Sequence, residues 1–169
     1  ANRRHMMKRS FIVLFLTAAL LAPIAASDFG ASAAVRDDNP TLEAMLRYAI
    51  QDEYLARAEY EQIMETHGDI RPFSNIIQAE ESHVGYLVPL FENLGLTVPA
   101  DTAADHVVVP ESLKQAIEIG VQAEIDNIAM YDRFLDQDLP ADVRDVFERL
   151  KNASENHLRA FRNNLMRYQ

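Results

Sequence analysis

The chain contains no cysteine and only five glycines among its 169 residues. Without cysteine it cannot form disulfides, thiolate zinc sites, iron–sulfur clusters or a cysteine nucleophile. The few glycines form neither of the phosphate-binding loops GxxxxGK and GxGxxG. Basic residues are also scarce, with 16 Lys and Arg against 26 Asp and Glu, so the formal net charge is −10. This acidic balance argues against nucleic acid as a partner, because a phosphate binder needs a basic face.

Residues 1–33 are predicted to be a secretory signal. The basic segment 1–10 is followed by an apolar run at 11–26 and by small residues that favour cleavage after Ala33. The alternative is an uncleaved membrane anchor, although the run is short for a membrane span and Pro23 interrupts it. We therefore expect export to the periplasm or the extracellular space. Contact with a membrane is expected only through an uncleaved signal.

The rest of the chain shows the apolar periodicity of α-helices and no clear alternation typical of strands. After a linker at 34–40, four amphipathic helices are predicted near 41–67, 72–95, 110–138 and from 141 onward. Tight turns join the first helix to the second and the third to the fourth. The segment 96–109 can span roughly 46 Å when extended, which exceeds the length of roughly 36 Å for a helix of about 24 residues. The sequence thus predicts an all-α fold over 41–169, a four-helix bundle of two antiparallel hairpins joined by one long crossover.

Polar residues interrupt the apolar stripe of every predicted helix. In chain order they are Glu53, then Glu80 and His83 as an E-x-x-H pair, then Glu124 and finally His157. Each lies roughly 12 to 24 Å along its helix from the nearest tight turn, which places all of them in the middle of the bundle. A buried carboxylate is costly unless it is paired or bound to a metal. This mixture of oxygen and imidazole ligands suits iron or manganese, and zinc less specifically.

The set of residues resembles the carboxylate-bridged di-iron site of ferritin-like proteins, in which Glu, E-x-x-H, Glu and His come from successive helices. The motifs LAR-x-x-Y at 55–60, AE-x-SH at 79–83 and SENHLRAF at 154–161 are similar to those of a ferritin-like family of bacteria and archaea that is known only as a domain of unknown function. The resemblance extends over about 41–166. It implies a ferritin-like bundle with one or two iron ions per chain, or with manganese or zinc instead.

Two positions depart from the di-iron pattern. A second E-x-x-H would place a glutamate where this chain has Ser154, and Asn127 stands just under one turn after Glu124 where another carboxylate would fit. We expect Ser154 and Asn127 to be weak ligands or to contact the ligands. One arrangement that remains is a single metal with four ligands, Glu80, His83, Glu124 and His157. The other is an asymmetric pair of metals bridged by Glu53 or Glu80.

Tyr60 and Tyr131 stand seven residues after Glu53 and Glu124, two turns further along the same helix faces. There they are candidates to hydrogen-bond a metal ligand, and ordinary core tyrosines are the simpler interpretation.

Two functions are consistent with this site. The first is an exported iron or manganese oxidoreductase of the ferroxidase or peroxidase type, which handles Fe²⁺ with O₂ or H₂O₂. The second is a non-catalytic bundle of the cell envelope that binds a metal or a partner protein. The sequence fixes no oligomeric state, and a homodimer is compatible with it.

Overall fold

The computed structural model describes residues 28–168. Residues 1–27, which make up most of the signal expected at 1–33, lie outside the described residues. The described part is helical and contains no strand. Its elements are α1 (Gly30–Ala34), α2 (Leu42–His67), α3 (Phe73–Asn93), the short 3₁₀ helix η1 (Ala103–His106), α4 (Leu113–Leu135), α5 (Ala141–Leu165) and the short 3₁₀ helix η2 (Met166–Tyr168). None of the helices between residues 28 and 168 is both long and apolar enough to cross a membrane.

Local sequence signals explain where the long helices begin and end. The side chain of Thr41 accepts a hydrogen bond from the Ala44 amide and caps α2, and Ser112 caps α4 in the same way. Gly68 ends α2 with a φ of 88°, a conformation that glycine adopts without steric cost. The helix α4 begins at Leu113 and ends at Leu135, which is shorter at both ends than the predicted 110–138.

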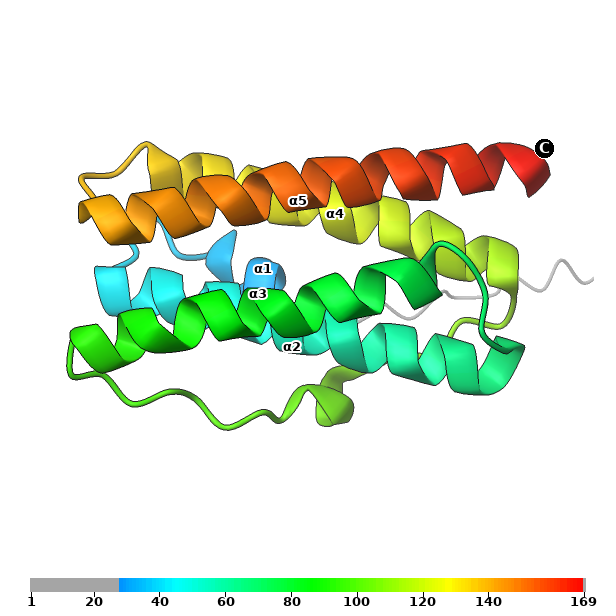
Figure 1. The fold of residues 1–169 in the computed structure, drawn as a ribbon, viewed down its shortest axis with the longest axis horizontal. Helices are drawn as coiled ribbons and strands as arrows, with labels where there is room; N and C mark the ends of the chain where they lie inside the picture. Colours follow the sequence, from blue (N-terminus) through cyan, green and yellow to red (C-terminus); the bar gives the residue numbers. More distant parts are fainter. Residues whose placement is uncertain (1–27, 169) are drawn as a thin grey trace, which may run out of the picture.

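The four long helices form two hairpins, α2 with α3 and α4 with α5, and these pairs make the most extensive contacts. The connection at 94–112 runs back along the bundle, so that α4 begins at the end of the molecule where α2 ended (Figure 1). Two side chains of α2 attach the connection, because Tyr54 donates to the Pro99 carbonyl at 3.4 Å and Arg57 pairs with Asp101. The predicted long crossover is present.

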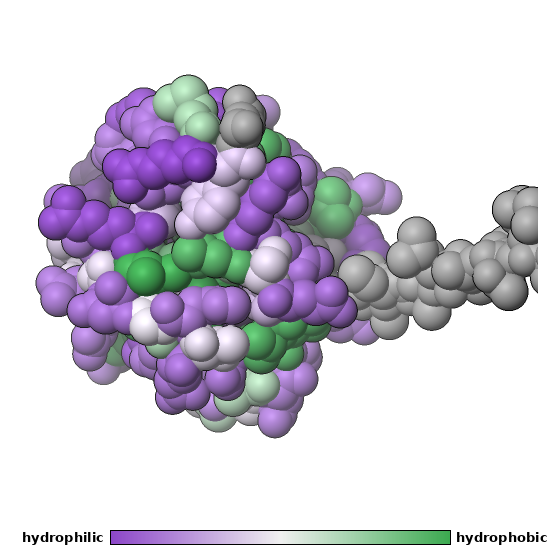
Figure 2. All heavy atoms as spheres, turned by 90° about the vertical axis from the view of Figure 1, so that its right-hand side faces the viewer, coloured by the Kyte–Doolittle hydropathy of each residue, from purple (hydrophilic) through white to green (hydrophobic). Residues whose placement is uncertain are grey.

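The apolar core consists of two clusters, one toward each end of the bundle. The first includes Leu46, Ile50, Leu87, Phe134 and Phe147. The second includes Tyr60, Ile63, Phe73, Ile117 and Phe161. The bundle end that carries the second cluster is mostly hydrophilic on its outside, with a few apolar residues among the hydrophilic ones (Figure 2). In α3, α4 and α5 the buried polar residues fall between the two clusters, and in α2 Glu53 directly precedes Tyr54 at the edge of the first cluster. The candidate site is therefore a polar layer enclosed by apolar packing.

The short helix α1 was not predicted. It packs against α2 and α4, and Phe29 and Ala34 at its ends are buried. Residues 28–33, which the sequence suggested as the end of the signal, are therefore part of the packed bundle in this structure.

Candidate metal centre

Every long helix contributes buried polar side chains to the central layer. They are Glu53 from α2, Glu80 and His83 from α3, Glu124 and Asn127 from α4, and Ser154 and His157 from α5. Each pair on one helix is separated by three residues, so both members point to the same side of that helix. The structure therefore brings together all five residues that the sequence proposed as metal ligands, and it places both departures from the di-iron pattern beside them.

Glu80 lies at the centre of this layer. One carboxylate oxygen, Oε2, lies 3.1 Å from Nδ1 of His83. The other oxygen, Oε1, lies 3.2 Å from Nδ1 of His157. The two imidazole rings stack with their centroids 5.7 Å apart. A single carboxylate therefore faces two histidines with two different oxygens.

A second glutamate completes the surroundings of each histidine. Glu53 Oε2 lies 3.0 Å from His83 Nδ1, and Glu124 Oε1 lies 3.3 Å from His157 Nδ1. Among the described residues, the ligand atoms form two groups of three whose members all lie within 4.8 Å of one another. Glu53, Glu80 and His83 make one group, and Glu80, Glu124 and His157 make the other. Glu80 belongs to both.

Burial and neighbouring charges shift the pKa values of the three glutamates. Burial raises the pKa of Glu53 well above its usual range, and the charge of Glu80 raises it further. Burial also raises the pKa of Glu124. Burial acts in the same direction on Glu80, but hydrogen bonds with His157 and His83 outweigh it and lower the pKa. Glu80 is thus the glutamate that keeps its charge most readily.

The two histidines hold protons strongly. Burial alone would lower the pKa of His83, but its hydrogen bonds to Glu53 and Glu80 raise it to about 10. The same balance, with Glu124 and Glu80 as partners, raises the pKa of His157 to about 9. Protons on the imidazoles therefore compensate the carboxylate charge in this arrangement. A metal would displace these protons, because it binds neutral imidazole and ionised carboxylate.

Two buried tyrosines hold the outer glutamates. Tyr131 donates a hydrogen bond to Glu53 Oε1 at 2.9 Å, and Tyr60 donates one to Glu124 Oε1 at 3.2 Å. Burial raises the pKa of both phenols, and the neighbouring carboxylates add to the rise, so both stay protonated. Each hydroxyl is thus a permanent donor that orients a glutamate from the opposite hairpin.

Ser154 and Asn127 bond to each other and to a residue that the sequence analysis missed. Ser154 donates to Asn127 Oδ1 at 3.3 Å, and the Asn127 amide donates to Asp52 Oδ2. Burial raises the pKa of Asp52 to about 7, although the Ala31 amide donates to its other oxygen. Asp52 was missed because it directly precedes Glu53 and so points about 100° away from it around the helix. The need of a buried Asn127 for partners was the available signal.

Comparison with known proteins supports this description. The Rubrerythrin family matches residues 43–165. The chain belongs to the rubrerythrin family. This membership confirms the ferritin-like resemblance, and it agrees with a metal-binding bundle whose carboxylates and histidines cluster between the helices.

A solved structure shows a similar fold. A hypothetical protein from Methanococcus jannaschii superposes with a TM-score of 0.68 at 23% sequence identity, and the match covers 78% of this chain and 85% of that one. At this identity the likeness concerns the fold. No curated protein matches the chain.

The donor set of this rubrerythrin-family member fits a metal. Three carboxylates and two imidazoles converge in two groups, and both groups share Glu80 through its two different oxygens. Oxygen and nitrogen donors of these types suit iron, manganese and zinc. The tyrosine hydroxyls supply the outer hydrogen bonds that orient carboxylate ligands in metal sites.

Proposed function

We propose that the protein is an exported oxidoreductase with a dinuclear iron or manganese centre, which handles Fe²⁺ with O₂ or H₂O₂. The observation that carries the proposal is the position of Glu80, whose two oxygens face two separate sets of ligands. A carboxylate in that position is suited to bridge two metal ions. Glu53 with His83 would complete one ion, and Glu124 with His157 would complete the other.

The geometry favours two metals over one. A single ion would need Glu80, His83, Glu124 and His157 to converge on one point. The ligand atoms of the described residues converge instead as two groups of three, and no group contains both histidines. Two divalent cations also compensate three buried carboxylates without the extra protons that the imidazoles now hold.

Three protein ligands per ion leave coordination positions open for a small oxidant. Iron in such a site supplies one-electron redox chemistry, and two Fe²⁺ together match the two electrons that H₂O₂ accepts when it is reduced to two waters with two protons. Glu53 and Glu124 hold the ligand sets in place. Tyr131 donates to the Glu53 oxygen that does not face His83, and Tyr60 donates to the Glu124 oxygen that also faces His157. The apolar clusters on both sides exclude bulk water from the layer.

Export is the part of the proposal that rests on sequence alone. The basic segment and the apolar run that support it lie at 1–26, outside the described residues.

A second candidate function is a metal-binding bundle without turnover. Ser154 favours it, because this serine stands where the di-iron pattern has a second bridging glutamate and it is bonded to Asn127 instead. With a single bridging carboxylate, the centre has less negative charge with which to stabilise oxidised metal ions.

The test is the consumption of Fe²⁺ and H₂O₂ by the protein after loading with iron. Wild type is expected to oxidise Fe²⁺ in a peroxide-dependent reaction, and Glu80→Gln is expected to lose both metal and turnover. Glu81→Gln is the matched control, because Glu81 is the exposed neighbour of Glu80 on α3. Wild type that binds metal at Glu80 and shows no turnover would favour the second function.

A further inference from the structure

The N-terminal segment 28–37 is built into the bundle beside the polar layer. The ring of Phe29 is 4% exposed and stacks on His106 with ring centroids 4.3 Å apart. Ala31 is also buried, and Ala34 is fully buried at 0% exposure. Terminal segments are usually poorly ordered unless they pack against the rest of the protein. The burial of Phe29, Ala31 and Ala34 therefore marks this segment as part of the core.

Side chains from two long helices hold the backbone of the segment. Arg133 of α4 donates to the Ala34 carbonyl at 2.9 Å and to the Asp37 carbonyl at 2.7 Å. Tyr48 of α2 donates to Asp37 Oδ2 at 2.9 Å. The segment therefore crosses from α2 to α4 and is tied to both.

The segment also bonds to the hydrogen-bond chain that ends at Ser154. The Ala31 amide donates to Asp52 Oδ1 at 2.8 Å, and Asp52 in turn accepts from Asn127. The approach is close, because a Cβ added at Gly30 would lie 2.5 Å from Asp52 Oδ1, and Gly30 has a φ of 56°. Glycine at this position is thus required both by the backbone conformation and by the contact with α2.

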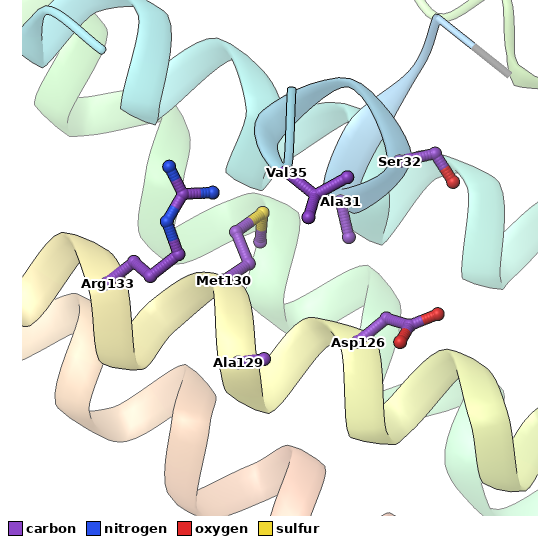
Figure 3. A pocket seen from close by; sticks show the side chains of 7 residues that line it. All are labelled: Ala31, Ser32, Val35, Asp126, Ala129, Met130 and Arg133. Atoms are coloured by element: carbon purple, nitrogen blue, oxygen red, sulfur yellow. The ribbon is translucent and has the colours of Figure 1, made fainter. Parts of the chain in front are cut away.

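The contact with α4 is looser than the contact with α2. A hollow of about 160 Å³ lies between α1 and α4. Figure 3 shows Met130 and Arg133 of α4 facing Ala31 and Val35 across it. On this side the segment is therefore held chiefly by the two hydrogen bonds of Arg133.

Cleavage after Ala33 conflicts with this packing. It would remove Phe29, whose ring stacks on His106, and the Ala31 amide, which donates to Asp52 Oδ1. Among the described residues, Asp52 would then keep only the hydrogen bond from Asn127. It would also place a charged α-amino group on Ala34, whose side chain packs in the apolar core of the intact bundle.

We propose that residues 28–37 stay in the mature protein as a strap across α2 and α4 that covers Asp52, and that the leader is cut upstream of Phe29. The sequence offers such a position, because Ala25 and Ser27 are small residues at −3 and −1 of a cut before Asp28. The position of the cut rests on the proposed export, whereas the strap rests on packing alone.

The first experiment is the intact mass of the chain, expressed in full in a Gram-negative host and recovered from its envelope. A chain that has lost its leader and begins at or before Asp28 is the expected result. A chain that begins at Ala34 would overturn the proposal. A chain that stays uncut would contradict the proposed cut, and the second experiment then decides on the strap.

The second experiment measures hydrogen exchange of the Ala31 amide in the full chain without metal. In wild type the amide is expected to exchange at least about 10-fold more slowly than in an unstructured peptide. Gly30→Ala is expected to abolish the protection, because the new Cβ would displace Asp52 or the strap. Gly85→Ala is the matched control, since a Cβ there meets open space, and it should keep the protection. An unprotected Ala31 amide in wild type would overturn the strap.

Discussion

The two hairpins of the bundle carry nearly the same set of side chains at the same spacings. In α2 and α3 these are Glu53, Tyr60, Glu80 and His83, and in α4 and α5 they are Glu124, Tyr131, Ser154 and His157. Each tyrosine bonds to the outer glutamate of the other hairpin. The hairpins differ where one has Glu80 and the other has Ser154.

This difference separates two kinds of polar layer. Glu80 places a charged carboxylate between two histidines. Ser154 donates to the neutral side-chain amide of Asn127. Asn127 in turn donates to Asp52, which also accepts from the Ala31 amide of the strap. One hairpin thus supplies the charged carboxylate between the histidines, and the other supplies a chain of hydrogen bonds. The site is therefore asymmetric although its scaffold is nearly symmetric.

We expect the largest effect in metal binding, where Glu80→Gln and Ser154→Ala should differ most. Loss of an outer hydrogen bond to a ligand costs a metal site about 10- to 100-fold in affinity, so loss of the shared ligand should exceed that range. Glu80→Gln should thus lose both metals, and Ser154→Ala should keep both. Elemental analysis after loading with Mn²⁺ measures the difference. Equal metal loss in the two variants would remove the distinction between the hairpins.

The pH dependence of the metal-free protein sharpens the role of the histidines. Their pKa values in the folded state, about 10 for His83 and about 9 for His157, exceed the unfolded value of roughly 6.5. Below pH about 6.5 the protonated histidines contribute their full stabilisation. As the pH rises from there to the folded pKa, each histidine lowers the free energy of unfolding by up to about 1.4 kcal/mol per pH unit.

The unfolding temperature of metal-free protein should therefore fall between pH 6.5 and 9. Metal-loaded protein should show a weaker fall, because the metal takes the place of the protons. A metal-free protein whose stability is constant over this range would contradict the ionic contacts of both histidines.

Ser154→Glu tests whether the asymmetry can be removed. The new carboxylate would join a layer that already holds three glutamates, and it would displace the bond to Asn127. Without metal, we expect a loss of about 1–3 kcal/mol in the free energy of unfolding, as for other buried groups without partners. With Mn²⁺ the loss should shrink or reverse. Urea unfolding with and without Mn²⁺ gives the answer, and a loss unaffected by the metal would show that Ser154 does not face the centre.

The smallest expected effects come from Tyr60→Phe and Tyr131→Phe. Each removes one hydrogen bond to an outer glutamate, which corresponds to about 1 kcal/mol in the free energy of unfolding. Because each hydroxyl donates one hydrogen bond to a glutamate of the other hairpin, the losses should be similar. Thermal unfolding of both variants is the measurement. A large loss in only one of them would mean that the hairpins differ beyond Glu80 and Ser154.

The helical part of the fold follows from local patterns in the sequence. Apolar residues at helical spacing, the caps Thr41 and Ser112 and the length of the 96–109 segment indicated four helices and a crossover. The height of the polar residues along their helices indicated that they would meet. These signals depend on the rise and period of the α-helix, and tertiary contacts did not override them.

The features that the sequence did not predict depend on contacts between distant segments. Asp52 enters the layer only because Asn127 and the Ala31 amide come to it from α4 and from the strap. The strap itself has the small residues that also suit a signal cleavage site, and burial of Phe29 against His106 distinguishes the two interpretations. The division of the ligands into two sets required the direction of each Glu80 oxygen, which no spacing contains.

The shared position of Glu80 is tested most directly by anomalous diffraction from crystals loaded with Mn²⁺. We expect two peaks of comparable height, one beside each carboxylate oxygen of Glu80, with His83 at one and His157 at the other. A single peak surrounded by Glu80, His83, Glu124 and His157, or no peak in this layer, would contradict it.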